Sequence, residues 1–77
     1  MKKLLEYLVT SIVEHPEAVV IEENEEEGQI NLNIQVHQDD VKIVIGKQGQ
    51  TIKALRELVK IKAIKERKKV TVNLLNQ

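Results

Sequence analysis

The feature that most constrains the fold of this chain is the segment VIGKQGQTI at residues 44–52. The 77 residues include three glycines, and two of them, Gly46 and Gly49, lie here with Lys47 and Gln48 between them. Apolar residues recur at helical spacing on either side, so the segment is expected to form a tight turn between two helices. Glycine at both ends permits positive φ angles and lets another molecule approach the backbone closely.

This turn has the properties of an anion site. The helix that follows it directs free N–H groups and the positive end of its dipole toward the turn, and Lys47 adds a mobile positive charge. Phosphate is therefore the expected ligand. The spacing differs from a Walker A loop, which has four residues between its glycines, and from the dinucleotide fingerprint, which needs a third glycine. By itself, G-x-x-G is equally compatible with a plain helix–helix turn.

Periodicity places six elements along the chain. It predicts a helix, two strands, two helices and a final strand, at about residues 2–14, 18–23, 30–37, 40–45, 50–66 and 70–75. Gly28 is expected to be the positive-φ residue of a hairpin loop at residues 24–28. Asp39 or Asp40 is the expected cap of the fourth element. This order predicts one α+β domain over residues 1–77, with three helices on one face of a three-stranded sheet.

Charge is distributed unevenly, although the net charge is zero. Residues 1–40 carry two lysines against ten acidic residues, a net of −8, and residues 41–77 carry ten basic residues against two acidic ones, a net of +8. A basic half of this kind predicts a polyanionic partner. The alternative is that the two halves pack together and their charges offset each other.

The segment VIGKQGQTI resembles the signature of the KH domain, in which hydrophobic-Ile-Gly-x-x-Gly-x-x-Ile joins two helices. The predicted element order, α-β-β-α-α-β, resembles the type II KH arrangement. With HPE after the first helix, the chain is similar over nearly its whole length to the small single-domain bacterial KH proteins of the KhpA (YlqC) type. KH domains bind RNA through a G-x-x-G loop that clamps the backbone of four nucleotides.

The resemblance implies a site for single-stranded RNA, in which the glycine loop holds the sugar-phosphate backbone and an apolar cleft contacts bases. The residues expected there are Ile45, Gly46, Lys47, Gln48, Gly49, Lys42, Lys53 and Arg56, with Ile34 or nearby residues in the cleft. Ile43 and Gln50 stand where basic residues are common in these proteins. The basic residues Lys42, Lys53 and Arg56 are expected to compensate.

Composition supports this expectation independently of the motif. Tyr7 is the only aromatic residue. RNA-recognition motifs, OB-folds and cold-shock domains stack bases on several aromatic rings, which a single tyrosine cannot supply. A nucleic-acid-binding protein of this composition must rely on backbone contacts and aliphatic grooves.

The long helix has apolar residues on two sides. Its core stripe is Ile52, Leu55, Val59 and Ala63, and on the opposite side are Ala54, Leu58 and Ile61. An outward apolar side predicts a protein partner, and we expect a homodimer through this helix. The alternative is a helix that is deeply packed all round. The KhpA resemblance also implies pairing with a larger, multidomain KH protein of the KhpB type.

The sequence contains no recognisable catalytic or metal-binding constellation. Cysteine is absent, and Ser11 and Thr51 have no obvious base, so no nucleophile is predicted. His15 and His37 are apart in the sequence without ligand companions, so they are interpreted as a helix-end and a strand-end residue. No metal and no cofactor is expected.

Together these patterns predict a non-enzymatic, cytoplasmic RNA-binding protein. The N-terminal segment carries Glu6 and Glu14 among its apolar residues, which indicates an amphipathic helix and no membrane segment. The expected role is that of an RNA chaperone or post-transcriptional regulator acting as a dimer. The rival hypothesis is a protein–protein interaction module whose glycine loop is only a turn.

Overall fold

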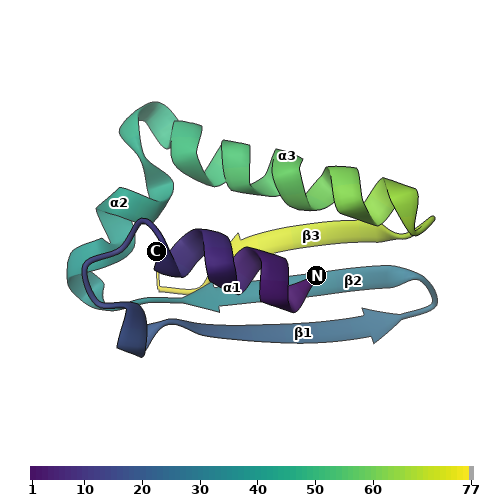
Figure 1. Cartoon of the computed structure of the whole chain (residues 1–77), viewed down its shortest axis with the longest axis horizontal. Coiled ribbons are helices and arrows are strands. Elements are labelled where there is room, and N and C mark those ends of the chain that lie inside the picture. The colour runs from purple at the N-terminus through teal and green to yellow at the C-terminus, as the bar shows by residue number, and fades with distance from the viewer. Residues whose placement is uncertain (77) are drawn as a thin grey trace.

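The computed structural model describes residues 1–76 and shows three helices on one face of a three-stranded sheet (Figure 1). In chain order the elements are α1 (Lys2–Thr10), β1 (Val20–Glu26), β2 (Gln29–Gln35), α2 (Val41–Ile45), α3 (Gln50–Lys65) and β3 (Lys69–Leu74). Short 3₁₀ turns precede β1, α2 and α3, at Pro16–Ala18, Gln38–Asp40 and Lys47–Gly49. The predicted α+β order and layering are confirmed. Within the described residues, no helix combines the length and the apolar composition that a membrane crossing needs.

The central strand β2 decides which side of the sheet is buried. It pairs with β1 in antiparallel and with β3 in parallel orientation. Its alternate residues Ile30, Leu32 and Ile34 face the helices and are buried, because successive side chains of a strand point to opposite faces. The core stripe of α3 packs over them, with Ile52, Leu55, Val59 and Ala63 all buried. Full burial of each large aliphatic side chain contributes about 1.5–3 kcal/mol.

The first helix is shorter than predicted. It ends at Thr10 instead of continuing to residue 14. The Thr10 hydroxyl donates to the Glu6 carbonyl at 2.7 Å, and the Ser11 hydroxyl donates to the Tyr7 carbonyl at 2.6 Å. The Tyr7 carbonyl also accepts the Ser11 backbone N–H at 3.1 Å, so the two hydroxyls add to the hydrogen bonds of the last turn. Side chains that bond to the backbone in this way make serine and threonine less favourable inside a helix, which favours an end here.

The β1–β2 hairpin is longer, and its turn tighter, than predicted. Strand pairing continues to Glu26 opposite Gln29, so residues 24–26 belong to β1 and not to a loop. The turn is formed by Glu27 at φ 50° and Gly28 at φ 80°. Two positive φ angles in succession are typical of the two-residue turns that match strand twist. The positive φ of Gly28 is confirmed, while the glutamates become strand because β2 supplies hydrogen-bond partners.

Candidate nucleic-acid interface

The glycine loop reverses the chain between α2 and α3 at one end of the molecule (Figure 1). Gly46 has φ 77° and ψ 172°, Gln48 has φ 55°, and Gly49 has φ 75°. Within the turn the Gly49 N–H donates to the Gly46 carbonyl at 3.1 Å, and the Gln50 N–H donates to the Lys47 carbonyl. The Lys47 and Gln48 side chains are exposed at the tip.

The two glycines are required for different reasons. A Cβ on Gly46 would lie 2.1 Å from the Thr51 Oγ1 and 2.7 Å from the Thr51 backbone nitrogen, so the missing side chain makes room for the first turn of α3. A Cβ on Gly49 would meet nothing within 4 Å. Open approach to the backbone, expected at both ends of the loop, is therefore a property of Gly49, and at Gly46 the space is filled by the protein's own helix.

The start of α3 offers donors toward solvent. Gly49 stands at the N-cap position of a helix of 16 residues, and no side chain within residues 1–76 caps it. The N–H groups of the first turn therefore lack a side-chain acceptor at the positive end of a long helix. This arrangement favours an anion held against the turn.

The basic residues around the loop are available for a ligand. Lys42 on α2 and Lys53 on α3 are exposed, as is Lys47 in the loop. Within residues 1–76, the only lysine or arginine side chain in an ion pair is Lys68, which contacts Glu25 at 2.9 Å. The hydrogen bond from Lys68 to Glu25 raises the pKa of the lysine above its ordinary value. The two oppositely charged halves meet there, at the far end of α3, and among residues 1–76 the cations beside the loop have no ion-pair partner.

A groove lies between α3 and the edge strand β3, with a volume of about 420 Å³. It is lined by Arg56, Glu57 and Lys60 of α3 and by Val70, Thr71, Val72 and Asn73 of β3. The Arg56 Nε donates to the Val72 carbonyl at 3.0 Å, which ties the helix to the strand. Arg56 was expected near the RNA from the sequence, whereas Thr71 and Asn73 were not, because only the fold brings these two segments together.

The two isoleucines expected in an apolar cleft have different environments. Ile45 is partly buried and packs against the core at the end of α2. Ile34 has 0 % of its surface exposed, so the expectation that it contacts bases is wrong. It lies on the central strand β2, and its role is in the core.

Asp40 has a structural role that differs from the predicted helix cap. It stands at the N-cap position of α2, but its carboxylate accepts hydrogen bonds from the backbone N–H of Glu14 at 3.0 Å and of His15 at 2.9 Å. Its side chain is fully buried. Burial alone raises the pKa of this carboxyl, but the two backbone N–H donors stabilise its ionised form, and the pKa is lowered. Asp40 thus fastens the α1–β1 connection to the start of α2.

The outer side of α3 is exposed, as predicted. Ala54 is exposed, and Leu58 and Ile61 expose 48 % and 54 % of their surface. The alternative of a helix packed all round is therefore wrong. Ile64, at 63 % exposure, extends the same apolar surface toward the end of the helix.

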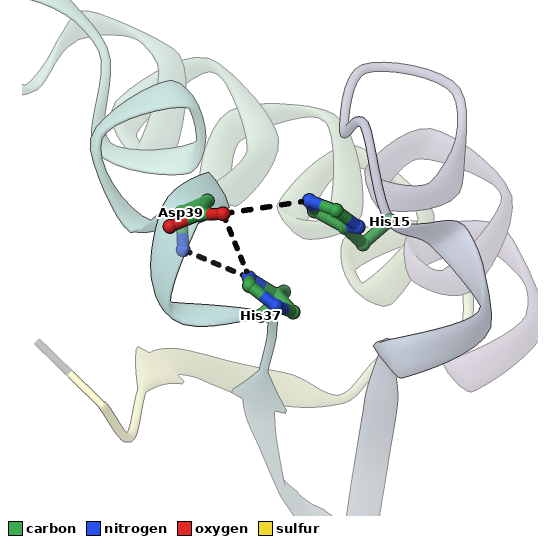
Figure 2. Close-up of side chains that lie close together, drawn as sticks. All are labelled: His15, His37 and Asp39. Carbon is green, nitrogen blue, oxygen red and sulfur yellow. Dashed lines mark hydrogen bonds and ion pairs between the residues drawn. The ribbon is translucent and has the colours of Figure 1, made fainter.

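The two histidines, expected to be apart, lie together at the start of α2 (Figure 2). Their rings are stacked with centroids 4.0 Å apart, and Asp39 lies beside both. His15 follows α1, whereas His37 and Asp39 follow β2, so no sequence spacing indicated the contact.

Comparison with known proteins identifies the family. Residues 2–74 match the family model described as KhpA/KhpB, KH domain. The chain is 45 % identical over 75 residues to the RNA-binding protein KhpA of Clostridium perfringens, covering 97 % of this chain and 100 % of that protein. It is 37 % identical over 76 residues to the protein of the same name from Halalkalibacterium halodurans, covering 99 % and 100 %.

A solved structure shares the fold. The crystal structure of Aquifex aeolicus Era bound to GDP·AlF₄⁻ superposes with a TM-score of 0.69 at 19 % identity, over 95 % of this chain and 28 % of that one. At this identity the similarity concerns the fold alone. The element order, the glycine loop between α2 and α3 and the match over residues 2–74 agree, and the chain belongs to the KhpA/KhpB family of KH-domain proteins.

Proposed function

We propose that this protein binds single-stranded RNA and catalyses no reaction on it. The observation that carries the proposal is the exposed glycine loop at the uncapped start of α3, beside lysines that have no ion-pair partner within residues 1–76. The relatives from Clostridium perfringens and Halalkalibacterium halodurans are both named RNA-binding protein KhpA, which supports the same ligand here.

In this proposal the loop holds phosphate and the groove receives a base. The open backbone at Gly49 and the first-turn N–H groups of α3 contact the sugar-phosphate chain, and Lys47 adds charge. The RNA strand continues along the groove between α3 and β3. There the guanidinium of Arg56 donates one of its five N–H groups to the Val72 carbonyl, and the others are available to a nucleotide. Thr71 and Asn73 add polar contacts on the strand side.

The loop is tested by the double variant Lys47→Asp, Gln48→Asp in filter binding to a short unstructured RNA. Two carboxylates at the exposed tip repel phosphate, and we expect affinity to fall more than tenfold. The matched control is Lys65→Asp, Asn24→Asp, which makes the same change in net charge at exposed positions on α3 and β1 away from the loop. Equal affinities of a folded loop variant and of the control would rule out the loop as the phosphate site.

We further propose that the outer side of α3 pairs two copies of the protein. The exposed Leu58, Ile61 and Ile64 form an apolar surface that polar side chains surround. A homodimer presents two loops to one RNA, which raises the apparent affinity of weak single sites. This suits an RNA chaperone or post-transcriptional regulator in the cytoplasm. Because the matching family model covers KhpB as well as KhpA, we propose a KhpB-type protein as a second partner for the same surface.

Light scattering on wild type and Ile61→Lys tests the pairing. Ile61 is more than half exposed, so lysine is tolerated in the monomer, whereas a charge in the middle of an apolar interface prevents association. We expect a dimeric wild type and a monomeric variant. A wild-type protein that is monomeric at high concentration would contradict the proposed homodimer.

The rival function, a protein–protein interaction module, is favoured by this same apolar surface. The two experiments separate it from RNA binding. If the protein is only an interaction module, the loop variant Lys47→Asp, Gln48→Asp still binds the protein partner, and Ile61→Lys does not. In that case any affinity for RNA is the same in the loop variant and in wild type.

A further inference from the structure

Two connections far apart in the sequence bring three metal-ligating side chains together at the start of α2. His15 comes from the segment between α1 and β1, and His37 and Asp39 come from the segment between β2 and α2 (Figure 2). One ligating atom from each residue lies within 4.8 Å of the other two. The RNA site proposed above uses none of these residues.

Electron-rich atoms converge in this cluster. The Asp39 Oδ2 lies 3.7 Å from the His15 Nε2 and 3.6 Å from the His37 Nδ1. The His37 Nδ1 accepts a hydrogen bond from the Asp39 backbone N–H at 3.0 Å, so this nitrogen carries its lone pair and not a proton. A cation placed among the three atoms is attracted by all of them.

We propose that His15, His37 and Asp39 bind one Zn²⁺ ion. Two imidazole nitrogens and a carboxylate oxygen are ligands that zinc prefers, with water in the fourth position. Tetrahedral bonds of about 2.0–2.1 Å place neighbouring ligand atoms roughly 3.4 Å apart. The observed separations of 3.6 Å and 3.7 Å from the carboxylate oxygen need only a small contraction.

The ring geometry defines the movement that binding requires. The imidazoles are stacked with an angle of 23° between their planes, and the His37 Nδ1 lone pair accepts the Asp39 backbone N–H. One ring must therefore turn out of the stack to direct its nitrogen at a shared ion. The side chains expose 34 % for His15, 41 % for His37 and 69 % for Asp39, which leaves room for that rotation and a path for the ion from solvent.

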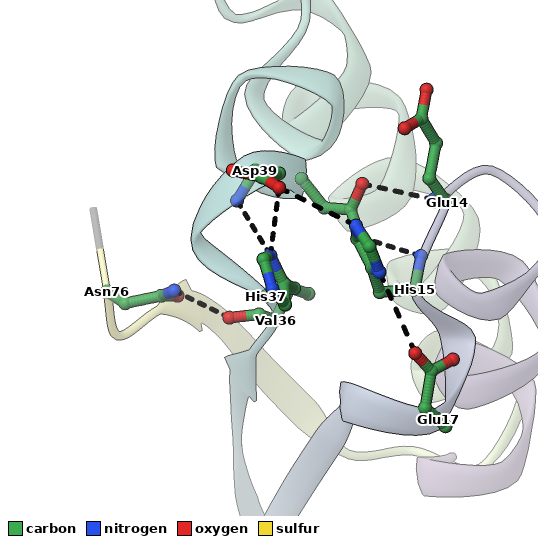
Figure 3. Close-up of polar contacts among 8 residues, drawn as sticks. Glu14, His15, Glu17, Val36, His37, Asp39 and Asn76 are labelled. Carbon is green, nitrogen blue, oxygen red and sulfur yellow. Dashed lines mark hydrogen bonds and ion pairs between the residues drawn. The ribbon is translucent and has the colours of Figure 1, made fainter.

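The surrounding contacts prepare the site. The buried Asp40 carboxylate accepts a hydrogen bond from the His15 backbone N–H at 2.9 Å, so the two connections are already held together beside the cluster. The other ring nitrogen of His15 lies 3.7 Å from a Glu17 carboxylate oxygen (Figure 3). A carboxylate beside the distal nitrogen of a ligating histidine orients the ring and makes it a better ligand. An ion here cross-links the α1–β1 and β2–α2 connections, so it stabilises the fold.

The test is calorimetric and thermal titration of the tag-free, full chain with Zn²⁺ alone. We expect one ion per chain and a melting temperature that rises with Zn²⁺, returns to its starting value with EDTA and is unchanged by Mg²⁺, which prefers oxygen ligands. Because each histidine supplies one of only three protein ligands, His15→Gln and His37→Gln should each weaken binding about tenfold or more. Glu22→Gln, at an exposed acidic position on β1, is the matched control and should bind as wild type does.

A second measurement keeps the proposal decisive if a histidine variant fails to fold. In wild type, Zn²⁺ should shift the imidazole ¹⁵N resonances of both His15 and His37 together, and at the same ion concentration that raises the melting temperature. Ring resonances that stay in place while Zn²⁺ binds, or binding that persists unchanged in both folded histidine variants, would overturn the proposal. Neither outcome bears on the RNA site, because the loop and the groove contain none of these residues.

Discussion

At the scale of single residues, the two loop glycines show how equal sequence signals acquire different roles. Gly46 and Gly49 both have positive φ, yet only Gly46 is pressed against the backbone of α3, through Thr51. Gly46 also has ψ 172°, a combination of angles that is almost restricted to glycine. Gly46 is therefore a packing residue, and Gly49 is the one whose open face is free for a ligand.

Alanine at these two positions should have different consequences for stability. Gly49→Ala meets only the cost of a left-handed conformation, about 1–2 kcal/mol. Gly46→Ala adds a clash with Thr51, so we expect a loss of about 3 kcal/mol or more. Urea unfolding followed by circular dichroism measures both.

Gly28→Ala is the control for the conformational cost, because Gly28 has a similar φ and open space around it in the distant hairpin. It should lose about as much stability as Gly49→Ala and keep its affinity for RNA, whereas Gly49→Ala should lose affinity too. Equal losses at Gly46 and Gly49 would mean that the contact with Thr51 is unimportant.

At the scale of elements, α3 combines several roles because one of its sides packs on the sheet and the other faces solvent. One side supplies the buried stripe over the sheet, and the other exposes apolar residues to solvent. Its N-terminal end borders the glycine loop and its middle borders the groove. A single helix thus connects the core, the proposed phosphate site and the proposed pairing surface.

The stability contributions of the two sides of α3 are compared by replacing leucine with alanine at position 55 and at position 58. Leu55 is 5 % exposed, so Leu55→Ala leaves a cavity and should lower the free energy of unfolding by about 2–5 kcal/mol. Leu58 is 48 % exposed, so Leu58→Ala in the monomer should change the free energy of unfolding by about 0.5 kcal/mol or less. Urea unfolding at several protein concentrations measures both.

The concentration series also tests the pairing surface. If α3 forms a homodimer, the wild-type midpoint rises with concentration, and Leu58→Ala reduces that rise because it weakens the interface. A midpoint that is independent of concentration in both proteins would contradict the homodimer and leave the core comparison intact.

At the scale of the whole molecule, charge is separated along the fold. The acidic residues gather in β1 and its hairpin, and the basic residues in α3 and the strand that follows. The Lys68–Glu25 contact joins the two groups at the hairpin end of the molecule. At the opposite end, with the glycine loop, the lysines have no ion-pair partner within the part of the chain that the structure describes, so an anionic ligand is attracted there although the net charge is zero.

RNA binding should therefore depend on salt to a modest extent. Contact with about three phosphates gives a slope of roughly −2 for the logarithm of the binding constant against the logarithm of salt concentration. Lys47→Ala should reduce the magnitude of this slope by about 0.7, and the exposed Lys65→Ala, at the far end of α3, should leave it unchanged. Fluorescence anisotropy with a labelled single-stranded RNA at several salt concentrations measures the slopes. Identical slopes for the two variants would contradict a phosphate contact at Lys47.

The sequence by itself determined the order of the elements and which side of each is buried. The alternation around Leu32 and the helical spacing of Leu55 and Val59 are local signals, because side-chain direction follows from the period of the backbone. The exposed side of α3 and the position of the glycine loop were predictable for the same reason. The ends of the elements were less predictable from the sequence, since the end of α1 and the length of β1 depend on hydrogen bonds with particular partners.

Only the tertiary structure decided the contacts between segments that are distant in the sequence. The stack of His15 on His37, the anchoring of two connections by Asp40, the complete burial of Ile34 and the groove beside β3 all join separate elements. No local period encodes them. They arise because the sheet and the helices, once packed, bring these segments within a few ångströms, where hydrogen bonds, excluded volume and charge act between them.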